Sequence, residues 1–170
     1  MKLVKPTPQH SEQIMAYRTA FLTVGEHPYG GSSLQNIDDY TKWLKNVIAQ
    51  EKGDQLPPNR VPATQFLSIE NGKVIGLLNI RHRLTPELLW ESGHIGYSIH
   101  PDDRRKGYAT EQLRLGLGEA KRLGLEKVLV TCDKANLASA KTIQKVGGVL
   151  ENEVVSSDTN EIVQRYWIEI

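Results

Sequence analysis

Two adjacent residues near the middle of the chain, Asn71-Gly72, predict a tight turn. They lie between two runs with the composition of strands, residues 64–70 and 73–80. Asn-Gly is the preferred sequence of two-residue hairpin turns, because both turn residues need positive φ angles and these two residue types adopt them readily. The sequence therefore predicts an antiparallel hairpin at this point, and the fold must be built around it.

Two helices are expected before the hairpin. Thr7-Pro8 is typical of a helix start, with Thr7 as N-cap and Pro8 in the first helical position. A glycine-rich loop over residues 25–33 separates this helix from a second one, capped near Asn36, and a further loop over residues 51–60 follows. The apolar faces at helical spacing are Ile14, Tyr17 and Phe21 in the first helix and Tyr40, Trp43, Leu44 and Val47 in the second.

Strands and helices alternate after the hairpin and a loop over residues 84–91. The expected elements are a strand over 95–99, a helix from Gly107 to about Leu123, a strand over 127–132, a helix over 136–146, and strands over 149–155 and 162–168. The uninterrupted apolar run at 128–130 suits a central strand that is buried on both faces. The helix over 136–146 is expected to turn Leu137, Ala140 and Ile143 inward.

The predicted element order is α-α-β-β-β-α-β-α-β-β, and a short N-terminal strand is compatible with it. This order indicates an α+β fold with a mixed sheet and helices packed on it. A chain of 170 residues is long enough for one domain with a sizeable core, so we expect residues 1–170 to form a single domain.

Composition excludes several functional classes. The net charge of +1 gives no general attraction to nucleic acid or to a membrane, and no apolar run is long enough to span a bilayer. The only cysteine, Cys132, excludes an internal disulfide and a cysteine-based metal site, so a reducing cytoplasm is the simplest expected location. No His/Cys cluster suggests a metal, and there is no phosphate-binding Gly-x-x-x-x-Gly-Lys or Gly-x-Gly-x-x-Gly motif.

The stretch between the strand over 95–99 and the next helix has the features of an anion site. It contains three basic residues followed by a glycine, and it reads Arg104, Arg105, Lys106, Gly107, Tyr108, Ala109, Thr110. The first N–H groups of a helix have no acceptor within the helix, and the helix dipole is positive there. Gly107 lets a ligand approach the backbone closely. The alternative interpretation is an ordinary solvated basic turn before an amphipathic helix.

The pattern Arg104-x-x-Gly107-x-Ala109 after Ile99-x-Pro101 resembles the acyl-CoA pyrophosphate loop of the GNAT superfamily of N-acetyltransferases. The predicted element order matches that family from end to end. Residues 93–109 and the later Asp133-x-x-Asn136-x-x-Ser139 resemble a bacterial branch of predicted acetyltransferases. The resemblance implies a mostly antiparallel central sheet flanked by helices, with acetyl-CoA as co-substrate and no metal.

The same resemblance implies which residues hold the coenzyme. The backbone N–H groups of the loop, residues 104–110, would bind the pyrophosphate. The backbone at Ile99 would pair with the pantetheine arm, and Asn136 and Ser139 would contact the pantetheine or the phosphates. Asn136 also has a simpler interpretation, because Asn is a common helix N-cap.

The acid and the base of the reaction are less clear from the sequence. Many family members have a Tyr seven residues after the Asn, which protonates the departing thiolate, but Ile143 stands at that position here. His94 is the best-placed titratable group for a base, although a structural histidine is the common alternative. Glu26 and His27 in the glycine-rich loop are further candidates, followed by Glu91 and His82. Alternation along the strand places His94, Gly96 and Ser98 on one face and Ile95, Tyr97 and Ile99 on the other.

The resulting expectation is an enzyme that moves an acetyl group from acetyl-CoA to an amine by direct attack on the thioester. The alternative is a CoA-binding module without catalysis, which the missing Tyr would allow. The acceptor is expected to be a small-molecule or peptide amine, with neither nucleic acid nor a membrane as partner. Its identity, the general base and the oligomeric state, for which a homodimer is one option, stay open.

Overall fold

The computed structural model describes residues 1–53 and 56–170. Residues 54 and 55, within the loop predicted over 51–60, lie outside the described residues. The predicted hairpin is confirmed, with β2 (Ala63–Glu70) antiparallel to β3 (Lys73–Arg81). Asn71 and Gly72 have φ angles of 48° and 79°, as a two-residue hairpin turn requires.

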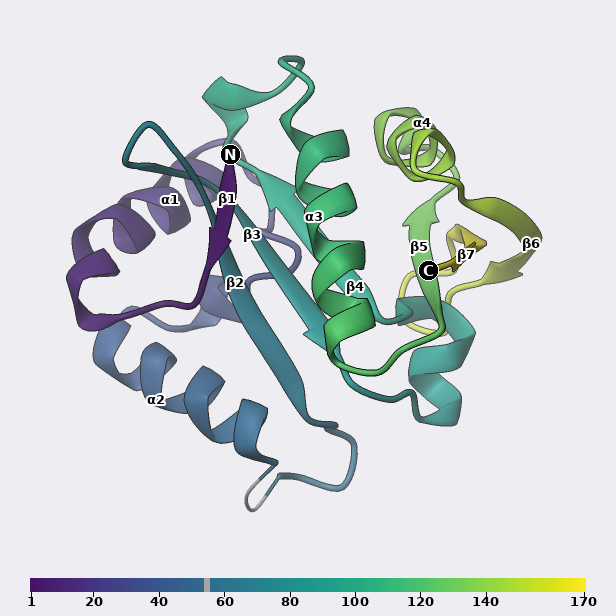
Figure 1. The fold of residues 1–170 in the computed structure, drawn as a ribbon, viewed down its shortest axis with the longest axis horizontal. Helices are drawn as coiled ribbons and strands as arrows, with labels where there is room; N and C mark the ends of the chain where they lie inside the picture. Colours follow the sequence, from purple (N-terminus) through teal and green to yellow (C-terminus); the bar gives the residue numbers. More distant parts are fainter. Residues whose placement is uncertain (54–55) are drawn as a thin grey trace.

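The strands form two separate sheets. A short N-terminal strand, β1 (Lys2–Val4), joins the hairpin and β4 (Ile95–Ile99) in a four-stranded sheet of order β1-β2-β3-β4. The second sheet has the order β5-β7-β6, and Figure 1 shows it set apart from the first. Its strands are β5 (Lys127–Asp133), β6 (Val149–Val155) and β7 (Ile162–Glu169). All strand pairs among the described residues are antiparallel.

The first two helices cover one face of the four-stranded sheet. A 3₁₀ turn over Pro8–His10, preceded by Thr7, leads into α1 (Ser11–Thr23). The N-cap of α2 (Tyr40–Lys52) is Asp39, whose side chain accepts from the N–H groups of Thr41 and Lys42. The prediction of a cap near Asn36 was therefore wrong. Asn36 ends a separate 3₁₀ turn, and the extended Ile37 (φ −125°) interrupts the helical path.

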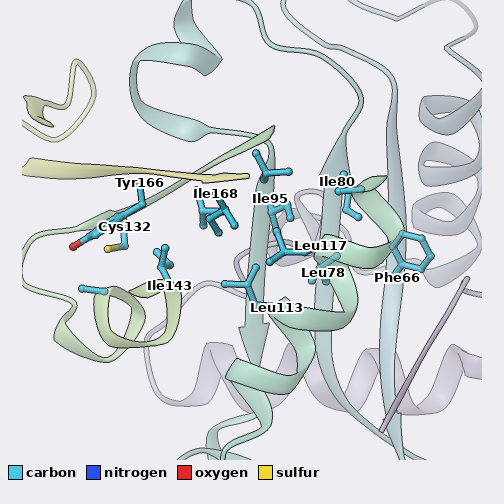
Figure 2. Packing of buried hydrophobic residues seen from close by; sticks show 14 residues of the cluster. Phe66, Leu78, Ile80, Ile95, Leu113, Leu117, Cys132, Ile143, Tyr166 and Ile168 are labelled. Carbon is cyan, nitrogen blue, oxygen red and sulfur yellow. The ribbon is translucent and has the colours of Figure 1, made fainter. Parts of the chain in front are cut away.

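The other helices, α3 (Tyr108–Arg122) and α4 (Leu137–Lys145), pack on the opposite side. Their core joins the two sheets, as Figure 2 shows, with Leu113 and Leu117 of α3 between side chains of both. Labelled members from the sheets are Phe66, Leu78, Ile80, Ile95, Cys132, Tyr166 and Ile168. Ala140 and Ile143 point inward as predicted, but the expectation for Leu137 was wrong, because its side chain is 66% exposed at the start of α4.

The predicted element order is confirmed. The predicted burial of β5 on both faces is confirmed as well, but β5 lies at the edge of the β5-β7-β6 sheet, so the expectation of a central strand was wrong. Val128, Leu129 and Val130 are all fully buried, as expected for a strand covered on both faces. The stretch expected to be a loop over 84–91 contains a π-helical turn, Leu88–Ser92. None of the helices in the described part of the chain is long and apolar enough to cross a membrane.

Candidate functional site

The two sheets meet where β4 begins. The N–H of His94 donates to the carbonyl of Leu129 at 2.7 Å, and the N–H of Leu129 donates back to the ring Nδ1 of His94 at 3.0 Å. Beyond this point β4 is paired only with β3, and its second edge has no strand partner among the described residues. An unpaired edge offers N–H and C=O groups to an extended ligand, as a further strand would.

His94 is buried at this junction, with 7% of its surface exposed. Burial, together with the nearby charge of Arg81, lowers the pKa of His94 to about 4. Because Nδ1 accepts a hydrogen bond, the neutral ring carries its proton on Nε2. A proton taken from a substrate would have to displace the Leu129 contact or bind to a nitrogen that already carries one. The catalytic role of His94 stays a prediction, and this geometry counts against it.

The alternation predicted for β4 is seen from Ile95 to Ser98. Gly96 and Ser98 face the α1 side, where Ser98 Oγ accepts from the hydroxyl of Tyr17 at 3.0 Å. Ile95 and Tyr97 face α3 and α4. Ile99, at the end of the strand, is 7% exposed, and its carbonyl accepts from Arg104 Nε at 3.3 Å.

The predicted anion loop ends at an uncapped helix N-terminus. Gly107 is the N-cap residue of α3, has a φ of 84°, and provides no side chain to cap the first turn. A Cβ added there would meet nothing within 4 Å, so open space lies next to this backbone. The first-turn residues, which include Tyr108, Ala109 and Thr110, are only partly buried. Their N–H groups are therefore available for an anion.

The three basic residues of the loop have different roles. The guanidinium of Arg104 donates two hydrogen bonds to the carboxylate of Glu26, in the loop after α1. The nitrogen–oxygen distances are 2.5 and 3.0 Å. Lys106 donates to the carbonyl of Asp102 and to the carboxylate of Asp103. Arg105 is exposed and makes no ion pair with any residue that the structure describes. Of the three, Arg105 is the cation most available to a ligand.

Asn136 is the N-cap of α4, since its side chain accepts from the N–H of Ser139 at 3.1 Å. This confirms its capping role and leaves a coenzyme contact as a prediction. The Ser139 hydroxyl lies 2.9 Å from the hydroxyl of Tyr97, so this contact connects β4 to α4 beyond the His94 junction. Burial raises the pKa of Tyr97 to about 12, so its hydroxyl keeps its proton at neutral pH. Ile143, which replaces the family's Tyr, is fully buried in the core.

A polar pocket lies on the α1 side of the first sheet. Its volume is about 380 Å³, and it is lined by the α1–α2 loop, the chain after α2, β3 and Gly96 of β4. Asn79 and Arg81 of β3 line it, and Gln65 of β2, opposite Asn79, donates to the carbonyl of Gly30. These polar side chains were not identified from the sequence, although Asn79 and Arg81 interrupt an apolar strand at alternate positions.

The loop that lines the pocket is held close to β4. A Cβ on Gly30 would lie 2.2 Å from the carbonyl oxygen of Gly96, so only glycine fits there. Ser32 and Ser33 have φ angles of 51° and 62°, which cost about 1–2 kcal/mol each for residues other than glycine. Such strained residues gather at binding sites more often than elsewhere, because the surrounding structure must hold them.

The remaining candidate bases are separated by the fold. Glu26 accepts hydrogen bonds from Arg104, which lower the pKa of its carboxyl group. Hydrogen bonds from Ser156 and Ser157 likewise lower the pKa of Glu91. His82 lies 2.8 Å from the hydroxyl of Thr64, and burial lowers its pKa. Only His27 lies in the lining of the pocket. Residues 1–53 and 56–170 contain no group of three or more His, Cys, Asp or Glu side chains that could hold a metal ion.

Solved structures with the same fold include several acetyltransferases. Mycobacterium smegmatis RimJ in complex with CoA-disulfide matches 98% of this chain and 80% of its own, with a TM-score of 0.74 and 18% identity. RimL, a ribosomal L7/L12 alpha-N-protein acetyltransferase in complex with coenzyme A, matches 99% and 93%, with a TM-score of 0.73 and 16% identity. The microcin C7 self-immunity acetyltransferase MccE, in complex with acetyl-CoA and AMP, has a TM-score of 0.71 and 13% identity over 99% and 91% of the chains.

The sequence itself carries the family assignment. No curated protein matches the chain. A family model described as the acetyltransferase (GNAT) domain matches residues 1–149, which is most of the chain. This chain belongs to the GNAT acetyltransferase family.

Proposed function

We propose that this chain transfers an acetyl group from acetyl-CoA to an amine by direct attack of the amine on the thioester. The observation that carries this proposal is the uncapped N-terminus of α3 at Gly107, which follows β4, a strand with an unpaired edge, after the 3₁₀ turn Pro101–Asp103 and a short loop. A helix N-terminus suits a pyrophosphate, and an unpaired strand edge suits the amides of a pantetheine arm. The two features follow each other along the chain, as the two parts of the coenzyme do.

In this arrangement the N–H groups at Gly107, Tyr108, Ala109 and Thr110 bind the pyrophosphate, and Arg105 adds positive charge. The pantetheine arm lies along β4 from Ile99 toward the His94 junction. Asn136 and Ser139, at the start of α4, contact the arm from the other side. Arg104 and Lys106 act by holding the loop, through Glu26 and Asp103. The core formed by α3 with both sheets also supports a single domain over residues 1–170.

When bound, acetyl-CoA supplies the electrophilic thioester carbon. The neutral amine nitrogen forms a bond to this carbon, the C–S bond then breaks, and the amine loses a proton as the thiolate leaves. An α-amine with a pKa near 8 is about one-tenth neutral at pH 7, whereas a lysine amine is about one in a few thousand neutral. An α-amine therefore depends least on a base from the protein.

The hydroxyl pair of Tyr97 and Ser139 is the proton source that we propose for the departing thiolate. It takes the place of the Tyr that the family pattern puts at Ile143. Its support is the 2.9 Å contact between the two hydroxyls, beside the unpaired edge of β4. Tyr97 keeps its proton because burial raises its pKa to about 12.

The test is thiol release from acetyl-CoA with a panel of amines, against a blank without amine. The panel includes N-terminal peptide amines and aminoacyl compounds, because two of the structural neighbours are described as acting on a ribosomal protein and in microcin C7 immunity. Amine-dependent thiol release with an N-acetylated product supports the proposal. Calorimetric CoA binding without turnover of any amine supports the alternative, a CoA-binding module without catalysis.

A further inference from the structure

We propose that the polar pocket beside Gly96 selects a small amine that also carries a carboxylate or a phosphate, and that Arg81 binds this anionic group. The acetyl-transfer part of this inference rests on the proposed function. The binding of an anion at Arg81 does not, because it follows from the charges and burial of the pocket alone.

The pocket lies on the polar half of one sheet face. Along β3, Leu77, Asn79 and Arg81 point to the same side, and Leu77 is packed under α1 and α2. At Asn79 and Arg81 the helices no longer cover the sheet, and these side chains line the pocket instead. These polar groups have partners within the protein, since Asn79 donates to Ser32 and Gln65, and Arg81 donates to two carbonyls. The pocket is therefore a stable polar surface, which suits a polar ligand better than an apolar one.

Arg81 is the main positive charge in this surface. Its Nη1 donates to the carbonyls of Ser92 and Gly93, at 3.3 and 2.9 Å, and burial lowers its pKa. No carboxylate of the described residues pairs with it, and none of the described residues that line the pocket is Asp or Glu. Two carbonyls fix the guanidinium but do not neutralise it, so an anion would gain from an already oriented donor group. Arg60, also in the lining, adds a second positive charge.

The strand register sets the spacing that a substrate must have. Asn79 lies opposite Gly96 of β4, and Arg81 lies two residues farther along, which is about 7 Å. An acceptor whose amine lies near Gly96, beside the proposed thioester, would place a group a few bonds away at Arg81. The pocket volume of about 380 Å³ is near the lower end for small-molecule sites, which are about 300–1,000 Å³. A small amino acid or amino phosphate matches this spacing and size.

The first arm of the test compares amines that differ in the anionic group. The pairs are 4-aminobutyrate with 4-aminobutanamide, and O-phosphoethanolamine with ethanolamine. Wild-type protein should prefer the anionic member of at least one pair by roughly 10- to 100-fold in kcat/KM, as expected for hydrogen bonds to a charged group. The preferred pair tells whether the anionic group is a carboxylate or a phosphate. Arg81→Met should reduce this ratio to within about threefold, mainly through KM.

The matched control is Arg83→Met, the same change at an exposed residue of the same segment, which should keep the wild-type ratio. Arg81→Lys keeps the charge and should retain part of the ratio. Melting temperatures of all variants separate loss of selectivity from loss of folding, since Arg81 also holds two carbonyls.

The second arm needs no turnover. Succinate and inorganic phosphate are titrated into the protein by calorimetry at low ionic strength, with succinamide as the neutral control. At least one anion should bind wild type and Arg83→Met at least 10-fold more tightly than Arg81→Met, whether or not any amine is acetylated. Equal binding to Arg81→Met and wild type, or no binding of either anion, would overturn the proposal. A preference only for acidic peptides, without response to these small anions, would overturn it as well.

Discussion

His94 and Leu129 are joined by two hydrogen bonds, one from each backbone N–H, and this pair holds the two sheets together at the start of β4. The ring nitrogen Nδ1 is the acceptor of the second bond, so the histidine serves the junction as a neutral side chain. Gly93, just before it, has a φ of 66°, and a Cβ there would lie 2.5 Å from the Leu129 carbonyl oxygen. Both Gly93 and His94, just before β4, therefore lie close to the backbone of Leu129.

The first prediction concerns the pH dependence of stability. The pKa of His94 is lowered to about 4 in the folded chain, while the unfolded chain keeps a value near 6.5. The unfolded state therefore binds more protons between these values. The stabilisation from neutral His94 is complete above about pH 6.5 and is lost as the pH falls to about 4. The free energy of unfolding should decrease by at most about 3 kcal/mol over this range.

Urea unfolding of wild type and His94→Asn between pH 7 and 4.5 measures this effect. Asn keeps an oxygen acceptor for the Leu129 N–H and does not titrate, so His94→Asn should lose less stability on acidification than wild type. His82 and His100 also have lowered pKa values, but they are present in both proteins. Identical pH slopes for the two proteins would contradict the assignment.

The second prediction separates structure from catalysis at the same residue. If His94 acted as the base, its loss would lower kcat/KM by about 10²–10⁴-fold. Because Nδ1 is already bonded to Leu129, we expect His94→Asn to keep kcat/KM within a few-fold of wild type at pH 7. A larger loss in folded His94→Asn, with unchanged CoA affinity, would restore His94 as the base, and its ring would then have to give up the hydrogen bond from Leu129 to free a nitrogen for the proton.

The third prediction tests the anion loop with two matched glycines. Gly107 precedes the first residue of α3, and Gly124 follows its C-terminal end. Their φ angles are 84° and 87°, and a Cβ added at either position would meet nothing within 4 Å. Alanine should therefore cost each about the same stability, roughly 1–2 kcal/mol. Only Gly107→Ala should also weaken CoA binding measured by calorimetry, because only Gly107 adjoins the proposed pyrophosphate site. Equal CoA affinity in both variants would remove this loop from the site.

The elements that the sequence predicts well are those with local signals. Asn71, Gly72 and Gly107 all have positive φ angles, which these residue types adopt more readily than others. Such a preference can be recognised from the residues themselves, without knowledge of the tertiary structure. The cap of α2 shows the limit of such signals, because Asn36 and Asp39 both satisfy the local rule. The choice between them depends on where Ile37 becomes extended, and that is decided by packing.

The polar pocket could not be predicted from the sequence, because it depends on the register between β2 and β3. Continuing the register from the turn, where Glu70 lies opposite Lys73, would place Gln65 opposite Leu78. A bulge between Ser68 and Ile69 shifts the pairing by one residue, so that Gln65 lies opposite Asn79 instead. The contact of His94 with Leu129 likewise joins residues 35 positions apart. Neither feature follows from a local pattern.

The fourth prediction separates the two roles of Asn136. Asp39 caps α2 as Asn136 caps α4, so Asp39→Ala is a matched control. Each alanine variant should lose about 0.5–2 kcal/mol in the free energy of unfolding. Asn136→Ala should also weaken CoA binding, once the folded fraction is taken into account, whereas Asp39→Ala should not. A change in stability alone would make Asn136 only a cap.

The last prediction concerns the proton for the departing thiolate. Two tyrosines contact a serine hydroxyl, one on each side of β4. Tyr17 donates to Ser98 at 3.0 Å, and the hydroxyl of Tyr97 lies 2.9 Å from that of Ser139. Both phenols have raised pKa values because they are buried. Phenylalanine at either position removes one buried hydroxyl and should cost a similar amount, about 0.5–1.5 kcal/mol of stability.

Only the pair at Tyr97 lies on the α4 side, where we place the thioester sulfur, so only Tyr97→Phe should slow the chemical step. A thiol with a pKa near 8.5 leaves tolerably as a thiolate, and the loss in kcat should therefore be near 10-fold, below the usual range for a general acid of about 10²–10⁴. Because Tyr97 stays protonated up to a pKa of about 12, this loss should be the same from pH 6 to pH 10. Steady-state rates of Tyr97→Phe, Tyr17→Phe and Ser139→Ala over this range make the comparison. Equal rates in the two tyrosine variants would assign Tyr97 to packing, and the proton would then come from water.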